Sequence, residues 1–126
     1  MKRLIGGRPL AMKSGNYCPE AGDFIWIDLD PTVGHEQSGR RPAIVLSPHN
    51  YNAAAGFCVV CPIASRVRDY PFEAKLPDSA SLRGVVLADR SRSISWEKRP
   101  IQHAGRAPDI VLTEVRERLA ALLGID

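Results

Sequence analysis

The chain has 126 residues, of which 44% are hydrophobic and 25% are charged. These values are typical of one globular domain, exclude a wholly disordered chain and leave no room for a second domain of usual size. The formal net charge of +3 is modest, and no apolar run reaches the roughly 20 residues that would span a bilayer, so we expect no membrane partner.

The N-terminal residues 1–19 are rich in Gly, Asn, Ser and Pro and contain no apolar stretch followed by a small-residue cleavage site. We therefore expect a flexible arm rather than a signal peptide, followed by a single domain over residues 20–126. Three cysteines, an odd number, fit a reducing cytoplasm better than a disulfide scaffold.

In chain order, short apolar or alternating runs predict strands over 23–30, 42–47, 57–64, 70–76, 84–89 and 91–96. Residues 50–56 predict a single helical turn, and Pro62 predicts an edge or a bulge in its strand. Residues 108–124 predict the one long helix, whose apolar face is formed by Leu112, Val115, Leu119 and Leu122. The expected class is α+β: a small, strongly bent antiparallel sheet or partly open barrel with a helix packed across it.

Cys58 and Cys61 form a C-x-x-C pattern on one of the predicted strands. Residues three apart on a strand point to opposite faces, so the two thiols are not expected to share a metal. The sequence offers no second ligand pair. We interpret both as small buried hydrophobic residues and expect no metal and no cofactor.

The stretch GHEQSGRRPAIVLSP, residues 34–48, concentrates ionisable side chains directly ahead of a buried strand. One interpretation is a solvated turn, in which His35 and Glu36 are ordinary surface residues and Arg40 and Arg41 pair with Asp28 or Asp30. The other is a site held at the entrance of a rigid strand. Further arginines lie beside loops and strand ends in the middle of the chain, which suits a polyanionic partner.

This group of residues matches the chemistry of RNA cleavage. An RNA phosphodiester carries its own nucleophile, the 2′-hydroxyl, so cleavage needs a base, cationic donors and a proton source but no metal. Glu36 is a suitable base, and the Arg41 guanidinium matches phosphate oxygens and stays charged. His35 is an easier proton donor than an arginine, because its unperturbed pKa is near 6.5.

The segment GDFIWIDLDPTVGHEQSGRRPAIVLSPHNYN closely resembles the opening of MazF/PemK/Kid toxins, the sequence-specific ribonucleases of bacterial toxin–antitoxin pairs. The resemblance continues through VCPIAS, YPFEA, GVVLADRSRSISW and the final helix, over roughly residues 20–124. It implies a PemK/CcdB-type fold, an SH3-like barrel with appended helices that works as a homodimer in the cytoplasm. It also implies metal-independent cleavage of single-stranded mRNA to 2′,3′-cyclic phosphate and 5′-hydroxyl ends, and thus inhibition of translation and growth.

The same resemblance implies a cognate, MazE-like antitoxin with an acidic, disordered segment. Two rival functions stay open. A CcdB-like toxin of the same fold inhibits DNA gyrase by binding protein, and an SH3-like barrel can also serve as a non-catalytic RNA-binding module. A pure protein binder, however, has no need for Glu36 and Arg41 beside Ser65.

Site residues are carried over from the family position by position. Glu36 and Arg41 match the catalytic carboxylate and the arginine before proline, and Ser65 matches a catalytic or phosphate-contacting hydroxyl. A hydroxyl at a strand end suits a phosphate oxygen. The arginines on the same two loops, Arg40, Arg66 and Arg68, are expected to bind RNA, and the loops 64–69 and 77–83 are expected to meet bases.

His35, Phe72 and Asp89 match positions that one branch of the family uses for RNA. That branch has an arginine where this chain has Leu87, so its version of the site is incomplete here. We therefore place Glu36, Arg41 and Ser65 ahead of His35 and Asp89. The alternatives are core packing for Phe72 and a turn-stabilising carboxylate for Asp89.

Overall fold

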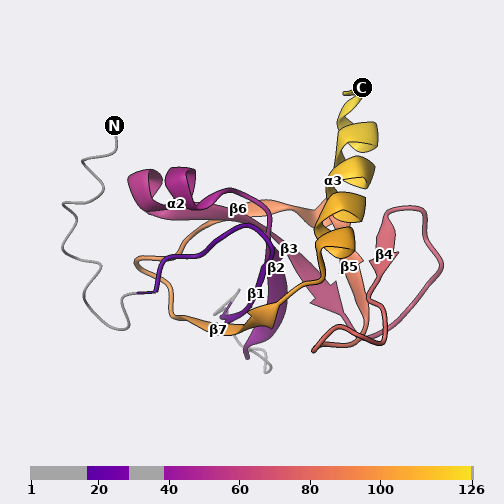
Figure 1. The fold of residues 1–126 in the computed structure, drawn as a ribbon, viewed down its shortest axis with the longest axis horizontal. Helices are drawn as coiled ribbons and strands as arrows, with labels where there is room; N and C mark the ends of the chain where they lie inside the picture. The colour runs from indigo at the N-terminus through magenta and orange to yellow at the C-terminus, as the bar shows by residue number, and fades with distance from the viewer. Residues whose placement is uncertain (1–16, 29–38, 126) are drawn as a thin grey trace.

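The structure, a computed structural model, describes residues 17–28 and 39–125 (Figure 1). Its strands are β1 (Asp23–Ile27), β2 (Arg41–Val45), β3 (Phe57–Ala64), β4 (Glu73–Lys75), β5 (Val85–Leu87), β6 (Arg92–Ser95) and β7 (Ile101–Arg106). Its helices are α2 (His49–Ala55), the 3-10 turn η2 (Ala88–Arg90) and α3 (Asp109–Leu123). The strands form one seven-stranded antiparallel sheet in the order β4-β5-β3-β2-β1-β7, with β6 also paired to β3. The predicted α+β class, an antiparallel sheet or partly open barrel with a C-terminal helix packed on it, is confirmed, and the strand order over the described residues is that of an open sheet.

Strand β3 is central to the sheet and pairs with three other strands, β2, β5 and β6. Its first half pairs with β6 from Phe57 to Val60, and its last two residues, Ile63 and Ala64, pair with β5. Pro62 lies opposite Ala43 of β2, next to the point where β3 changes partner on its other side. Pro62 was predicted at an edge or a bulge; it instead lies within a central strand, where this gap in pairing tolerates a residue without an N–H group.

The core consists of two clusters, one on each face of the central strands. Alternate residues of β1, β2 and β3 point to opposite faces, as the period of a strand requires. One cluster lies beneath α3 and contains Phe24, Ile44, Leu46, Cys61, Ile63, Val111 and Val115, and the other contains Ile25, Ile27, Ala43, Val45, Cys58, Val60 and Ile94. Cys58 and Cys61 therefore lie in different clusters as buried free thiols, which confirms their interpretation as core residues.

Both predicted helices are present. α2 ends at Gly56, whose φ of 75° provides a left-handed cap. α3 packs against η2 and β4, and Figure 1 shows it next to β4 and β5. It ends at Gly124, whose φ of 74° gives the same left-handed cap. The predicted apolar face was partly wrong, because Leu122 is 43% exposed whereas Val111 is buried.

Several strands differ from the prediction. The strand expected over 70–76 is reduced to β4, because the Glu73 N–H donates to the Tyr70 carbonyl (2.9 Å) and closes a turn first. β1 ends at Ile27, and residues 29–30 of its predicted extent lie outside the described residues. β7 was not predicted. Its sequence, IQHAGR, has no apolar alternation because it pairs along only one edge, with β1.

The N-terminal boundary also differs from the prediction. Residues 17–19 were expected to belong to a loose arm, but Pro19 is buried and Tyr17 packs against the core cluster that contains Ile25. Tyr17 and Pro19 therefore pack with the domain, and residues 1–16 of the predicted arm lie outside the described residues. Among residues 17–28 and 39–125, no helix has the length and apolar character needed to cross a membrane.

Candidate functional site

Five arginines meet in one open hollow of about 610 Å³. The hollow, called here the arginine hollow, lies where β2 begins, β3 ends and β5 begins. Its lining consists of Gly39, Arg40, Arg41, Pro42, Ile63, Ala64, Ser65, Arg66, Arg68 and Arg83. Sequence segments separated by some forty residues thus share one surface.

The antiparallel register brings these segments together. Ala43 lies opposite Pro62, and continuing that register by two residues brings Arg41 opposite Ala64 and therefore beside Ser65. β5 joins from the other edge of β3, where Val85 lies opposite Ala64. The end of β3 is thus flanked by a basic segment on both sides.

Gly84 allows the approach of β5 to β3. Its φ is +120°, and a Cβ built on it would lie 2.1 Å from the carbonyl oxygen of Ala64. No side chain fits at that distance, and L-residues rarely adopt this conformation. Glycine at position 84 is therefore what places Arg83 against the hollow.

In the part of the chain that the structure describes, the hollow carries positive charge without a matching carboxylate. Arg40 donates to the side-chain oxygen of Gln102 at 2.5 Å. Among the described residues, no carboxylate forms an ion pair with the arginines of the hollow, and no Asp or Glu is in its lining. The alternative pairing of Arg40 or Arg41 with Asp28 is not formed, while Asp30 lies outside the described residues. Because guanidinium groups stay protonated, the hollow is a permanent anion-attracting surface.

The structure brings together five of the nine predicted site residues: Arg40, Arg41, Ser65, Arg66 and Arg68. It adds Arg83, which the sequence indicated only as a basic residue on a loop expected to meet bases. His35 and Glu36 lie outside the described residues. The arginines of the hollow share one sequence feature, a position next to the end of a strand. Arg83 has this feature as clearly as Arg66 does.

Phe72 and Asp89 are absent from the lining of the arginine hollow. Phe72 is half-buried against the core cluster beneath α3, and its ring lies edge-on to Tyr70 with centroids 6.0 Å apart. Asp89 accepts a hydrogen bond from the Tyr70 hydroxyl at 2.8 Å. That hydrogen bond raises the pKa of Tyr70. Phe72 matches the structural alternative considered for it, core packing, whereas the contact of Asp89 with Tyr70 joins two side chains 19 residues apart and is not a turn. The RNA-binding role of both residues stays a prediction.

No metal-binding group forms in the part of the chain that the structure describes, where no three His, Cys, Asp or Glu side chains gather. Burial raises the pKa of both the Cys58 and the Cys61 thiol to about 12. Both thiols are therefore protonated at neutral pH. In that state they are poor nucleophiles and poor ligands.

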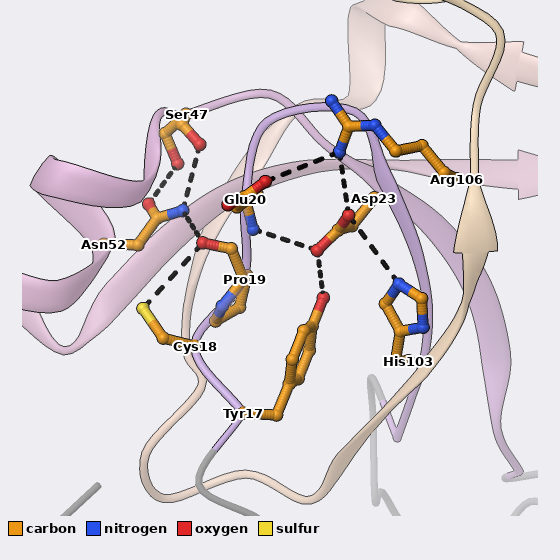
Figure 2. A network of polar contacts seen from close by, with 9 residues as sticks. All are labelled: Tyr17, Cys18, Pro19, Glu20, Asp23, Ser47, Asn52, His103 and Arg106. Carbon is orange, nitrogen blue, oxygen red and sulfur yellow. Dashed lines mark hydrogen bonds and ion pairs between the residues drawn. The ribbon is translucent and has the colours of Figure 1, made fainter.

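A second polar cluster, which the sequence did not indicate, lies around Asp23 (Figure 2). The Asp23 carboxylate is buried and accepts hydrogen bonds from the Tyr17 hydroxyl, the Glu20 N–H (3.0 Å) and the Arg106 guanidinium (3.0 Å). His103 lies 3.7 Å from it. Burial, together with the neighbouring carboxylate, raises the pKa of Tyr17. We call these five residues the Asp23 network.

Asn52 forms the adjoining part of Figure 2. Fully buried, it donates to the carbonyls of Pro19 and Ser47, both at 2.9 Å, and accepts from the Ser47 hydroxyl at 2.6 Å. Trp96 donates to its backbone carbonyl at 2.9 Å. Each polar atom of this side chain has a partner, which is typical of a structural group rather than a reactive one.

Over residues 20–123 the sequence matches the family described as PemK-like, MazF-like toxin of type II toxin–antitoxin systems. The endoribonuclease toxin MazF of Escherichia coli strain K12 is 41% identical over 108 residues, which cover 86% of this chain and 96% of that protein. A crystal structure of MazF from Deinococcus radiodurans is similar at a TM-score of 0.77 and 49% identity, over 86% of this chain and 99% of that one. A MazE–MazF structure from the same organism gives a TM-score of 0.77 at 44% identity, over 87% and 99% of the two chains.

Proposed function

Because this chain belongs to the PemK-like, MazF-like toxins of type II toxin–antitoxin systems, we propose that it is a sequence-specific endoribonuclease that binds single-stranded RNA in the arginine hollow. The observation that carries the proposal is the meeting of five arginines and Ser65 at one strand end. The relatives named endoribonuclease cover most of the chain, which supports the activity.

The reaction needs only the side chains named from the sequence. Glu36 removes the proton of the 2′-hydroxyl, the 2′-oxygen attacks the adjacent phosphorus, and the bond from phosphorus to the 5′-oxygen breaks. Arg41 donates to the phosphoryl oxygens as charge develops, and Ser65 holds a phosphate oxygen. His35 supplies a proton to the leaving 5′-oxygen. The products are a 2′,3′-cyclic phosphate and a 5′-hydroxyl.

The position of Glu36 in the sequence is consistent with this role, because it precedes Gly39, which lines the arginine hollow, by three residues. Its assignment as the base rests on the family resemblance.

A cleavage assay tests the proposal. Purified protein is incubated with a long defined RNA in excess EDTA, and the ends are mapped by primer extension. We expect cleavage at a short recurring sequence, cyclic phosphate ends and full protection by a 2′-O-methyl group at the scissile nucleotide. Cleavage of the methylated RNA would contradict the mechanism, because its nucleophile is blocked.

The rival function, a CcdB-like toxin that inhibits DNA gyrase, is not favoured. Relatives that cover most of this chain are named endoribonucleases. A supercoiling assay with purified gyrase makes the distinction directly. Inhibition of supercoiling without any RNA cleavage would establish the rival.

We further propose control by a cognate antitoxin. A MazE–MazF structure is among the similar structures, and the arginine hollow offers a cationic surface for an acidic, disordered segment. Ordering such a segment costs conformational entropy, so tight inhibition needs a long contact. Antitoxin peptide titrated into a preformed complex with labelled, uncleavable RNA is expected to displace the RNA. Unchanged RNA binding at saturating peptide would mean that inhibition acts elsewhere.

Homodimer formation and residence in the cytoplasm are part of the same proposal. Apolar residues at the end of α3, including Leu123 at 62% and Ile125 at 60% exposure, are suitable for burial between two copies. A closed two-fold pair would present two equivalent arginine hollows. Light scattering coupled to gel filtration tests the mass, and a monomer at micromolar concentration would contradict the dimer.

A further inference from the structure

The loop that carries three of the proposed RNA-binding residues is anchored by one buried carboxylate. Residues 65–70, here the arginine loop, connect β3 to the turn before β4 and include Ser65, Arg66 and Arg68. All six residues are exposed, and none belongs to a helix or strand. Glu73, by contrast, begins β4 and is only 6% exposed.

The Glu73 side chain turns back toward the arginine loop. The Arg68 N–H lies 2.9 Å from its Oε1 and 3.2 Å from its Oε2, and the Tyr70 N–H lies 3.4 Å from Oε1. Its own N–H donates to the Tyr70 carbonyl at 2.9 Å. A buried carboxylate with backbone donors forms stronger hydrogen bonds than a neutral acceptor does. Glu73 therefore fixes the loop at two backbone positions.

The far end of the loop has additional supports. The Tyr70 hydroxyl donates to Asp89 at 2.8 Å, and the Arg118 guanidinium donates to the Pro71 carbonyl. These contacts hold the loop at and beyond Tyr70. Only the Glu73 carboxylate, among the described residues, bonds to a backbone N–H within the part of the loop that lines the hollow.

We infer that Glu73 is a positioning residue for RNA cleavage: it holds the arginine loop so that Ser65, Arg66 and Arg68 face the scissile phosphate. The inference rests on the proposed ribonuclease function. Donors aimed at developing charge lose most of their effect when they move, and a displacement of about 1 Å can cost about 10²-fold in rate. Glu73 itself is absent from the lining of the hollow, so its proposed role is to position other residues.

The positioning role can be distinguished from two other roles for Glu73, charge tuning and a role in folding alone, because each predicts different results for the variants. If its negative charge tunes the arginines, then Glu73→Asp keeps function and Glu73→Gln loses it. If it positions the loop by hydrogen bonds, the order reverses: the Gln carbonyl still accepts from Arg68 and Tyr70, whereas Asp is one methylene too short. If it serves only folding, none of the variants changes turnover once the protein is folded.

The experiment compares Glu73→Ala, Glu73→Asp and Glu73→Gln with the wild type at a temperature at which all are folded. Glu117→Gln is the control, because Glu117 is an exposed residue of α3 and its loss removes the same charge. We expect kcat to fall about 10²-fold in the Ala and Asp variants, by more than KM rises, and to stay within about ten-fold in the Gln variant. Wild-type kcat in Glu73→Ala, or activity in Asp but not in Gln, would overturn the inference.

Amide hydrogen exchange gives a readout that does not depend on activity. The Arg68 amide should be protected in the wild type and in Glu73→Gln but not in Glu73→Ala. If the wild type cleaves no RNA, the proposed function fails, and the exchange data still decide whether Glu73 anchors the loop. If the wild type cleaves RNA and Glu73→Ala loses neither protection nor rate, the positioning role alone is refuted.

Discussion

The Asp23 network and the arginine hollow are the two main gatherings of charge in the described structure, and they are built in opposite ways. In the network, one buried carboxylate is surrounded by donors, among them the Arg106 guanidinium (Figure 2). In the hollow, five guanidinium groups share a surface on which no described residue provides a carboxylate. A fold gains stability from satisfied polar groups but not from crowded like charges. The Asp23 network is therefore the part that stabilises the domain, and the arginine hollow is the part suited to an anionic ligand.

The two regions also lie at opposite ends of the same pair of strands. Phe24 lies opposite Ile44 near the network, and Ile27 lies opposite Arg41 at the hollow. Ile27 lies four positions after Asp23 along β1, or about 13 Å away at the usual rise per residue. Substitutions in the two regions should therefore act additively, with one set changing stability and the other changing chemistry.

The largest expected effect is on turnover. Glu36→Gln and Arg41→Ala should each lower kcat by about 10²–10⁴-fold, because one removes the base and the other a charge donor. Urea unfolding should show little change for Arg41→Ala, since its side chain is exposed. Arg92→Ala, at an exposed residue of β6 outside the hollow, is the matched control. Near-wild-type rates for Glu36→Gln would transfer the role of base to His35 or Asp89.

The second-largest expected effect is on stability, and it comes from the close approach of β5 to β3 beside the hollow. Gly84→Ala introduces a Cβ 2.1 Å from the Ala64 carbonyl oxygen, so β5 must separate from β3. We expect a loss of about 3 kcal/mol or more in unfolding free energy, from backbone strain and overlap together. Gly124→Ala is the control: its φ is also positive, at +74°, but nothing lies within 4 Å, so about 1 kcal/mol is expected. Equal losses in the two variants would show that the close approach is unimportant.

A smaller effect on stability is expected from the network. Asp23→Ala leaves the Tyr17 hydroxyl and the Glu20 N–H without their acceptor, which should cost about 1–3 kcal/mol in unfolding free energy. Cleavage per folded molecule should be unchanged, because the network lies at the other end of β1. A fall in kcat without a fall in stability would mean that the two regions are coupled. The double variant with Arg41→Ala tests additivity directly.

Much of the fold was predictable because the apolar pattern of the chain is local. The strand over 57–64 and the helix that ends before Gly124 agree with prediction to within one residue. β7 was not predictable in this way, because a strand paired along one edge with polar and glycine positions shows no alternation. The Asp23 network was missed for a related reason: its donors come from residues 17, 20, 103 and 106, which only the folded sheet brings together.

The types of residue in the site were more predictable than the individual residues that form it. Arg41 and Ser65 stand next to strand ends, so their meeting follows from antiparallel pairing once β2 and β3 are known. Arg83 lines the hollow because Gly84 allows β5 to approach β3 closely. No pattern in the sequence shows that a glycine has this role. Arg83 is therefore the residue by which the extent of the hollow is best examined.

The smallest expected effect concerns Arg83 and the salt dependence of RNA binding. Each phosphate contact with a single strand contributes about 0.7 to the slope of log K against log salt. Arg83→Ala should lower the magnitude of that slope by about 0.7 and weaken binding of 2′-O-methyl RNA about four-fold at 0.15 M salt. Fluorescence anisotropy over a salt series measures both quantities, with Arg92→Ala as the variant that should change neither. Weaker binding with an unchanged slope would assign Arg83 to a base edge instead of a phosphate, because base contacts release no counterions. Unchanged affinity together with an unchanged slope would remove Arg83 from the RNA site and confine the functional hollow to the ends of β2 and β3.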